Sequence, residues 1–316
     1  MSRTDLQTID GFADQVISGI SAKLPRQLMS DLVIRQVQVT KTNSRVLHGI
    51  TFEMKNKNMA PTFYLDEPYE DYLSGRDIDE IILELAKSYL ISLVGPMAPI
   101  PEEPDFMSIK NHLALRVINT DKNADLLEDV PHKSIEFGLS LICDVKMDDG
   151  SGGCWRTHVL YSFLDGETED TLFKQAFANV RRVEPPVLRT TFPAAVPESC
   201  VINLLNSKQR IREHEKEPMY VLTTRGGYYG AAAFFYPGMM KEVADKLGES
   251  YYAIPSSVHE FVIIPLSTNP EVRILEKILK ESNQIPGSSG DMISENVFFY
   301  DIVSNSLSIA SDNAMS

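Results

Sequence analysis

The sequence feature that most constrains the fold is the recurrence of short alternating segments beside segments with helical spacing. Residues 32–40 read LVIRQVQVT and alternate apolar with polar side chains, and residues 47–54 repeat the alternation after the polar turn KTNSR. Alternation with a period of two indicates strands with one buried face, and a polar turn between two such strands indicates a hairpin. Apolar residues recur at helical spacing in residues 5–23 and 77–94, so a helix is predicted on each side of this hairpin.

Segments rich in proline divide the chain into modules. Residues 95–105 read GPMAPIPEEPD, and Glu184 is followed by two prolines, so helix and strand are both interrupted at these places. We therefore expect an N-terminal α-β-β-α module at 1–97, a central β-α-β-β-α module at 106–186, a connecting segment at 187–218, a C-terminal β-α-β-β-α-β module at 219–303 and a tail at 304–316. Hairpins backed by helices predict the α+β class rather than a parallel, doubly wound sheet.

The same patterns predict individual elements within these modules. Residues 134–147 are predicted as one long strand, and residues 197–209 as a helix within the connecting segment. Residues 229–247 are predicted as one helix that ends at Gly248. Residues 251–254 and 260–266 are predicted as paired strands joined by a turn of sequence PSSV.

Composition disfavours several classes of partner. Lys and Arg number 30 against 44 Asp and Glu, so a formal charge of -14 leaves no basic surface for nucleic-acid phosphates or an anionic membrane. Apolar runs such as residues 231–240 are much shorter than the roughly 18–20 residues that cross a bilayer. The 3 cysteines form no CxxC pair, and the N-terminal residues lack the apolar core of a secretory signal. A cytoplasmic location is therefore predicted, with nucleic acid and membrane both disfavoured as partners.

The stretch SSVHE at residues 256–260 places two serines, a histidine and a glutamate close together. Its structural interpretation is a tight turn, in which serine hydroxyls satisfy nearby backbone groups. Its catalytic interpretation makes Ser257 the nucleophile and His259 the base of a hydrolase, but no G-x-S-x-G elbow is present. Neighbouring side chains of a strand point to opposite faces, so His259 and Glu260 are not expected to act together. The structural turn is the favoured prediction.

A glycine-rich turn between a predicted strand and a predicted helix offers a candidate anion site. The sequence TTRGGYYG contains Arg225, Gly226, Gly227 and Gly230. Such a turn at the start of a helix is typical of phosphate binding, although neither G-x-G-x-x-G nor G-K-[ST] is complete here. The simpler interpretation is that these glycines permit positive φ or close packing.

The histidines form neither HExxH nor another local helical metal motif. His132, Glu136 and His158 form a candidate two-histidine, one-carboxylate metal site if the strands of the central module pair. The alternative is that these histidines are hydrogen-bonded structural residues, and no cofactor is predicted.

Tyrosines and carboxylates alternate in residues 64–80, YLDEPYEDYLSGRDIDE. No calcium-loop pattern is present, so a solvated segment is the simplest interpretation. Tyr64, Tyr69 and Tyr72 are nevertheless the best candidates for contact with a protein partner, because tyrosine is common at interfaces.

Three stretches together resemble a known sequence family. They are PTFYLDEPYEDYLSGRDIDEI, RVINTDKNADLLEDVPHKSIEFGLSLICDV and YYGAAAFFYPGMMKEVADKLGESYYAIPSSVHEFVIIP. They resemble an uncharacterised bacterial domain-of-unknown-function family with an aliphatic-Pro-Ser-Ser-x-His-Glu hairpin, and the likeness covers most of residues 4–303. The resemblance implies a bacterial or mobile-element cytoplasmic protein and transfers no catalytic residue.

Because no catalytic constellation is complete, the leading hypothesis is a non-enzymatic protein that binds a protein partner or a small ligand. A metal-assisted or serine hydrolase is the first alternative. An acidic protein that mimics nucleic acid is the second, since the sequence pI is about 4.9.

Overall fold

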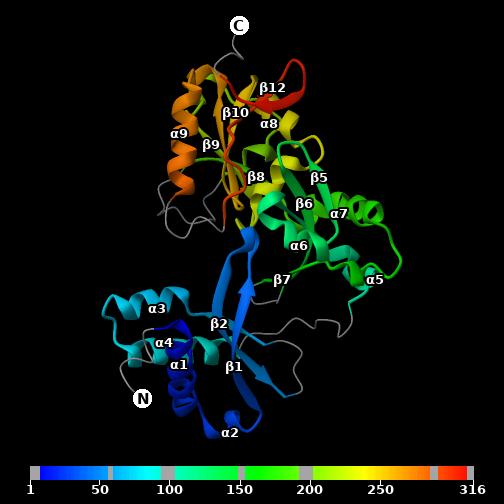
Figure 1. Ribbon diagram of the computed structural model, residues 1–316. Helices are drawn as coiled ribbons and strands as arrows, with labels where there is room; N and C mark the ends of the chain where they lie inside the picture. Colours follow the sequence, from blue (N-terminus) through cyan, green and yellow to red (C-terminus); the bar gives the residue numbers. More distant parts are fainter. Residues whose placement is uncertain are drawn as a thin grey trace. The chain divides into compact units, whose positions relative to one another are not determined.

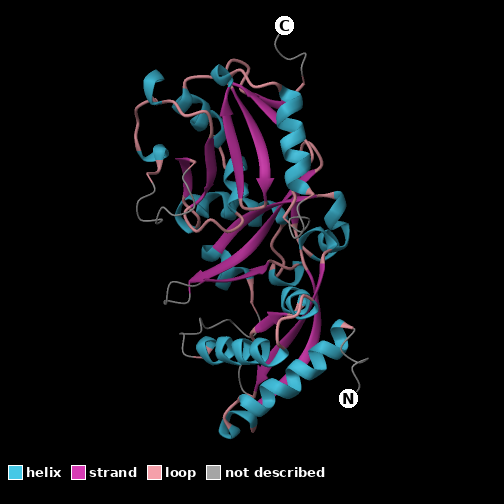
Figure 2. Cartoon of the chain, turned by 90° about the vertical axis from the view of Figure 1, so that its left-hand side faces the viewer, coloured by secondary structure: helices cyan, strands magenta, loops and turns pink. Residues whose placement is uncertain are grey.

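The computed structural model describes residues 8–55, 60–93, 104–148, 154–191, 202–284 and 291–311. It contains three sheets whose strands pair in antiparallel fashion, together with separate helices, so the predicted α+β class is confirmed (Figure 2). The chain divides into two compact units, the first at 1–41, 45–104 and 147–155, and the second at 42–44, 105–146 and 156–316. Most of the predicted boundary at 95–105 lies outside the described residues.

The first unit is a three-stranded sheet with helices, drawn in blue and cyan in Figure 1. Its elements are α1 (Ile9–Lys23), α2 (Arg26–Met29), β1 (Leu32–Thr40), β2 (Val46–Met54), β3 (Thr62–Tyr64), α3 (Asp66–Leu73) and α4 (Ile78–Ser92). Asp77 caps α4 by accepting hydrogen bonds from two backbone N–H groups of its first turn. Phe12, Phe52 and Tyr89 belong to one apolar core, in which the rings of Phe52 and Tyr89 stack with centroids 4.1 Å apart. The predicted hairpin and the helix on each side of it are confirmed.

The second unit holds most of the four-stranded sheet of β4 (Leu113–Asn119), β5 (His132–Ile135), β6 (Leu139–Asp148) and β7 (Cys154–His158), while the end of β6 and the start of β7 are counted with the first unit. Its helices are α5 (Phe106–Ile109), α6 (Ala124–Asp129) and α7 (Glu169–Val183). The prediction of one strand at 134–147 is wrong, because β5 and β6 form a hairpin there. Phe137 and Gly138 make the turn, with φ of 68° and 70°. A positive φ is rare for phenylalanine, so Gly138 is the single residue of this turn that indicates it.

The same unit contains a six-stranded sheet in the order β13-β12-β10-β11-β9-β8. Its elements are β8 (Pro186–Thr190), β9 (Tyr220–Thr224), α8 (Met239–Leu247), β10 (Tyr251–Ser257), β11 (Glu260–Pro265), α9 (Val272–Asn283), β12 (Phe298–Asp301) and β13 (Ser306–Ile309). Helix α9 covers one face, where Leu275 and Leu279 belong to the same core cluster as Tyr252 and Ile254 (Figure 1). The β-α-β-β-α-β order predicted for 219–303 is confirmed.

Both edge strands of this sheet lie outside the predicted C-terminal module. Strand β8 occupies the start of the predicted connecting segment, and β13 lies in the predicted tail. Each is only four or five residues long, and so short a run shows little alternation of its own. The predicted central and C-terminal modules thus each have a sheet, and both sheets belong to the second unit apart from the end of β6 and the start of β7.

Two predicted helices differ from the structure. Residues 230–235 form a 3-10 turn, and α8 begins only after Pro237 and Gly238, whose φ is 76°. Proline and a glycine with positive φ interrupt the helix predicted at 229–247. The helix predicted at 197–209 lies partly outside the described residues, and its described part contains a 3-10 turn at Leu204–Asn206. Among all the helices that the structure describes, none is long and apolar enough to cross a membrane.

Candidate functional site

One face of the four-stranded sheet carries charged side chains in place of the usual apolar ones. Arg116 of β4 and Asp144 of β6 share this face with Lys146, Arg156 and His158. The Asp144 side chain is 0% exposed, and those of Arg116 and Arg156 are 7% and 9% exposed. Buried charges are very unfavourable unless they are paired and hydrogen-bonded, so this face must form a connected network.

Asp144 is the centre of the network. Its Oδ2 accepts hydrogen bonds from Arg116 Nε at 3.0 Å, Arg116 Nη2 at 2.7 Å and Arg156 Nε at 2.5 Å, and its Oδ1 lies 2.8 Å from His158 Nδ1. Burial alone would raise the pKa of Asp144, but the charges of Arg116 and Arg156 and the contact with His158 outweigh burial and hold that pKa well below its usual range. Asp144 is therefore an ionised carboxylate.

Glu184, directly after α7, is the second carboxylate of the network. Its Oε1 accepts a hydrogen bond from Arg156 Nη1 at 2.8 Å and lies 3.4 Å from Lys146 Nζ. Its Oε2 is buried and has no hydrogen-bond partner among the described residues. Burial raises the pKa of Glu184, although Arg156 and Lys146 oppose the shift. The network thus contains three cationic side chains, Arg116, Lys146 and Arg156, and the two carboxylates just described. It has one positive charge in excess when His158 is neutral.

The glycine-rich turn proposed as an anion site covers this network. The guanidinium carbon of Arg116 lies 3.5 Å from the centre of the Tyr229 ring, and that of Arg156 lies 4.8 Å from it. Lys146 Nζ is 3.8 Å from the position that a Cβ on Gly226 would occupy. Tyr229 adopts a left-handed backbone conformation with φ of 54°, which directs its ring onto the two arginines. The structure therefore brings the turn together with buried cations.

The hairpin containing SSVHE meets the same turn from the other side. His259 Nδ1 accepts a hydrogen bond of 3.0 Å from the backbone N–H of Tyr229, and the carbonyl oxygen of His259 accepts one of 2.8 Å from Thr223 Oγ1. Gly230 is packed so closely that an added Cβ would lie 2.6 Å from the backbone nitrogen of Thr224 and 2.7 Å from the carbonyl oxygen of His259. The glycine-rich turn and the SSVHE hairpin, which are distant in the sequence, therefore form one structural unit.

The hairpin itself differs in detail from the prediction. Strand β10 continues through Ser257 with a bulge between Pro255 and Ser257, so the turn consists of Val258 and His259 rather than PSSV. His259 contacts Tyr229, whereas Glu260 lies 3.6 Å from Arg189, so the two neighbours have separate partners. Ser257 Oγ accepts a hydrogen bond from the His259 backbone N–H at 3.1 Å. No hydrogen bond joins this hydroxyl to the His259 ring in the described part of the chain. The contacts are those of a structural turn.

The candidate metal ligands do not come together. His132 Nδ1 lies 3.3 Å from the carbonyl oxygen of Val130, His158 contacts Asp144, and Glu136 is exposed beside the β5–β6 turn. No group of three or more His, Cys, Asp or Glu side chains within the described ranges could hold a metal ion. His132 and His158 are each hydrogen-bonded to protein groups, which is the alternative considered from the sequence.

The candidate interface tyrosines pack within the first unit. The rings of Tyr69 and Tyr72 lie 5.3 and 5.4 Å from the ring of Phe12, and Lys41 Nζ lies 4.8 Å from the centre of the Tyr64 ring. All three tyrosines are half-buried. Their apolar surface thus contributes to the packing of this unit, and contact with a protein partner stays a prediction.

Replacing Ser257 and His259 separately by alanine tests the structural role of the hairpin. We expect each change to lower the free energy of unfolding by about 1 kcal/mol, because each removes the acceptor of one backbone N–H group. Urea unfolding followed by circular dichroism gives the measurement, and Lys280→Ala at an exposed position of α9 is a control outside the hairpin. Loss of an enzymatic activity at unchanged stability would contradict the structural interpretation.

Comparison with known proteins gives a family and no closer relative. Neither a curated protein nor a solved structure matches the chain significantly. A model of a family of unknown function, DUF5688, matches residues 9–302, which include the charged network, the glycine-rich turn and the SSVHE hairpin. This match agrees with the resemblance noted in the sequence. The chain therefore belongs to the DUF5688 family of unknown function.

Proposed function

We propose that the second unit is a non-enzymatic binding domain for a small ligand that presents a carboxylate or phosphate group. The supporting observation is the excess of buried cations over carboxylates in the network around Asp144. A positive charge enclosed by protein is screened less than one in water, so it attracts an anion more strongly. Protonation of Glu184, which burial favours, would increase the excess further.

Lys146 and His158 are the members of the network that can reach such a ligand. Their side chains are 16% and 29% exposed, whereas Arg116 and Arg156 lie beneath the Tyr229 ring. Lys146 Nζ has three donors, and Glu184 is its ion-pair partner among the described residues. Gly226 carries no side chain beside this ammonium group, which leaves room for an anion near the backbone of the turn.

Two further observations support binding without catalysis, and a third supports a reducing compartment. The Ser257 hydroxyl and His259 Nδ1 each accept a hydrogen bond from a backbone N–H group, so neither is arranged as a nucleophile or its base. Cys143 is a buried free thiol in a chain with 3 cysteines, which agrees with a cytoplasmic location.

Titration of the full chain with inorganic phosphate tests this proposal. We expect saturable binding by calorimetry at constant ionic strength, and we expect Lys146→Gln to weaken it about tenfold or more, because a charge-assisted hydrogen bond contributes about 1.5–3 kcal/mol. Lys133→Gln is the matched control, since Lys133 is an exposed lysine of β5 in the same sheet. The proposal fails if neither phosphate nor acetate binds saturably, or if both lysine variants weaken binding equally.

A further inference from the structure

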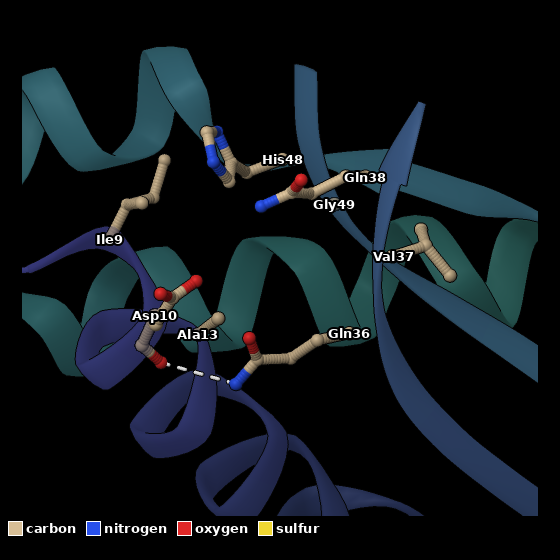
Figure 3. A pocket seen from close by; sticks show the side chains of 8 residues that line it. All are labelled: Ile9, Asp10, Ala13, Gln36, Val37, Gln38, His48 and Gly49. Carbon is tan, nitrogen blue, oxygen red and sulfur yellow. Dashed lines mark hydrogen bonds between the residues drawn. The ribbon is translucent and has the colours of Figure 1, made fainter. Parts of the chain in front are cut away.

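The first unit contains a small hollow that the proposed function does not use. It has a volume of about 160 Å³ and lies between the start of α1 and the strands β1 and β2 (Figure 3). Its lining residues are Ile9, Asp10, Ala13, Gln36, Val37, Gln38, His48 and Gly49. Since a cavity volume of about 10–15 Å³ is enough to hold one water molecule, the hollow has room for several waters. It therefore suits a compact molecule with a short carbon chain.

Gln36 presents an acceptor to this hollow. Its Nε2 donates to the carbonyl oxygen of Asp10 at 3.2 Å and to Asp14 Oδ1 at 2.6 Å, so both amide hydrogens are already used. Among the described residues the amide oxygen of Gln36 has no hydrogen-bond partner, and it points into the hollow in Figure 3.

His48 also presents an acceptor, because Asp66 fixes its tautomer. The backbone N–H of His48 donates to Asp66 Oδ2 at 3.0 Å, and His48 Nδ1 lies 3.4 Å from Asp66 Oδ1. An ionised carboxylate only accepts hydrogen bonds, so the proton of the neutral ring is on Nδ1. The lone pair of Nε2 then remains available to a ligand.

Asp10 adds a full negative charge. Its carboxylate is exposed in the first turn of α1 and has no hydrogen bond or ion pair among the residues that the structure describes. The polar lining thus combines this carboxylate, the Gln36 amide oxygen, a His48 imidazole lone pair and the side-chain amide of Gln38, which also points into the hollow in Figure 3. Ile9, Ala13 and Val37 add apolar surface. A ligand complementary to these groups has a positive charge, several N–H donors and a short apolar part.

We infer that this hollow binds a small organic ammonium ion, such as a primary alkylamine. An ammonium group supplies three donors and one positive charge, which match the acceptors around it. A metal ion is a poorer match, because the described residues contain no group of three or more His, Cys, Asp or Glu side chains that could hold one. The inference is independent of the anion site, since the two lie in different units and involve different residues.

Nuclear magnetic resonance of the full chain with n-butylamine hydrochloride tests the inference. We expect saturable shifts of the backbone amide signals of Ala13, Val37 and Gly49, with 1-butanol at the same concentrations as a neutral ligand of similar shape. Asp10→Asn keeps the shape of the side chain and removes its charge, so we expect it to weaken amine binding about tenfold. Glu70→Gln, which removes an exposed charge from α3, is the matched control and should bind as the unchanged chain does.

Three results would overturn the inference. They are equal shifts with 1-butanol and n-butylamine, amine binding that Asp10→Asn leaves unchanged, and the absence of saturable shifts at the lining residues. Far-UV circular dichroism of Asp10→Asn shows whether the variant keeps its fold, and His48→Gln provides a second variant that changes an acceptor on β2. Because phosphate binding is measured with Lys146→Gln, failure of one site leaves the result for the other unaffected.

Discussion

Asp144→Asn is expected to lower the free energy of unfolding of the second unit by about 3–5 kcal/mol, the usual cost of removing one partner of a buried ion pair. The substitution changes the size of the side chain little, so packing is not the cause. It removes the negative charge that Arg116, Arg156 and His158 share, and it leaves two nearly buried guanidinium groups beneath Tyr229 with Glu184 as the remaining buried carboxylate. Uncompensated buried charge is among the few causes of effects this large.

Urea unfolding, with hydrogen exchange of the β4 and β6 amides to locate the change, measures the effect of Asp144→Asn. The control is Glu128→Gln, which removes an exposed carboxylate from α6 in the same unit and should change stability by less than about 0.5 kcal/mol. Equal stability of Asp144→Asn and the unchanged chain would show that the network contributes little to the fold.

The depressed pKa of Asp144 fixes the direction of its pH dependence. The unfolded chain binds a proton at this carboxyl near the ordinary aspartate pKa of about 3.9, whereas the folded chain binds it only at lower pH. The contribution of Asp144 is thus complete above about pH 5 and decreases as the pH falls below the ordinary value. The stability difference between the unchanged chain and Asp144→Asn should therefore shrink on acidification. A difference that grows on acidification would contradict the assignment.

Gly230→Ala is expected to lower the stability of the second unit by about 3 kcal/mol or more, above the usual range for overpacking, because the new methyl group meets backbone atoms. A Cβ at this position would contact the hydroxyl of Thr223, and it would lie 2.6 Å from the nitrogen of Thr224 and 2.7 Å from the carbonyl oxygen of His259. The backbone atoms of β9 and of the hairpin turn cannot move apart without breaking hydrogen bonds. One of these joins Thr223 of β9 to the carbonyl oxygen of His259. The expected result is separation of the glycine-rich turn from the hairpin.

Gly226→Ala is the matched control for Gly230→Ala. Among the described residues, the same methyl group at residue 226 meets only Lys146 Nζ, at 3.8 Å, which is an ordinary contact. We expect Gly226→Ala to change stability by less than about 1 kcal/mol. Thermal unfolding of both variants, with the Tyr229 amide signal as a local probe, checks the comparison. Similar effects of the two substitutions would show that the close packing at Gly230 is not what holds the turn.

The elements that were predicted correctly have strong local patterns. Strands β1 and β2 alternate apolar with polar side chains over residues 36–40 and 50–54, and α4 combines helical spacing with a capping aspartate, so neighbouring residues alone indicate them. Strands β8 and β13 are stabilised by pairing with β9 and β12 rather than by their own pattern. The β5–β6 turn was missed because a single glycine, Gly138, marks it, and the other residue at positive φ is a phenylalanine rather than the usual asparagine or glycine.

The charged network could be suspected from the sequence but not assembled from it. Arg116 in LALRVIN and Asp144 in LICDVK are isolated charges within otherwise apolar strands, and such charges at buried positions often mark functional sites. Their partners come from other elements, since Glu184 follows α7 and Tyr229 lies after β9. No spacing along the chain indicates which distant residues meet, so the SSVHE hairpin and the glycine-rich turn could only be analysed separately.

Strand β13 has a practical consequence for work on this family. It provides the outermost backbone pairing next to β12, yet it begins at Ser306, after the family match ends at residue 302. A shortened protein that stops at this limit would leave the outer peptide groups of β12 without partners. An edge strand with unpaired peptide groups is a template to which a second copy of the chain can add its own strand. Self-association created in this way would be mistaken for a natural oligomer, so the four residues of β13 need to be kept.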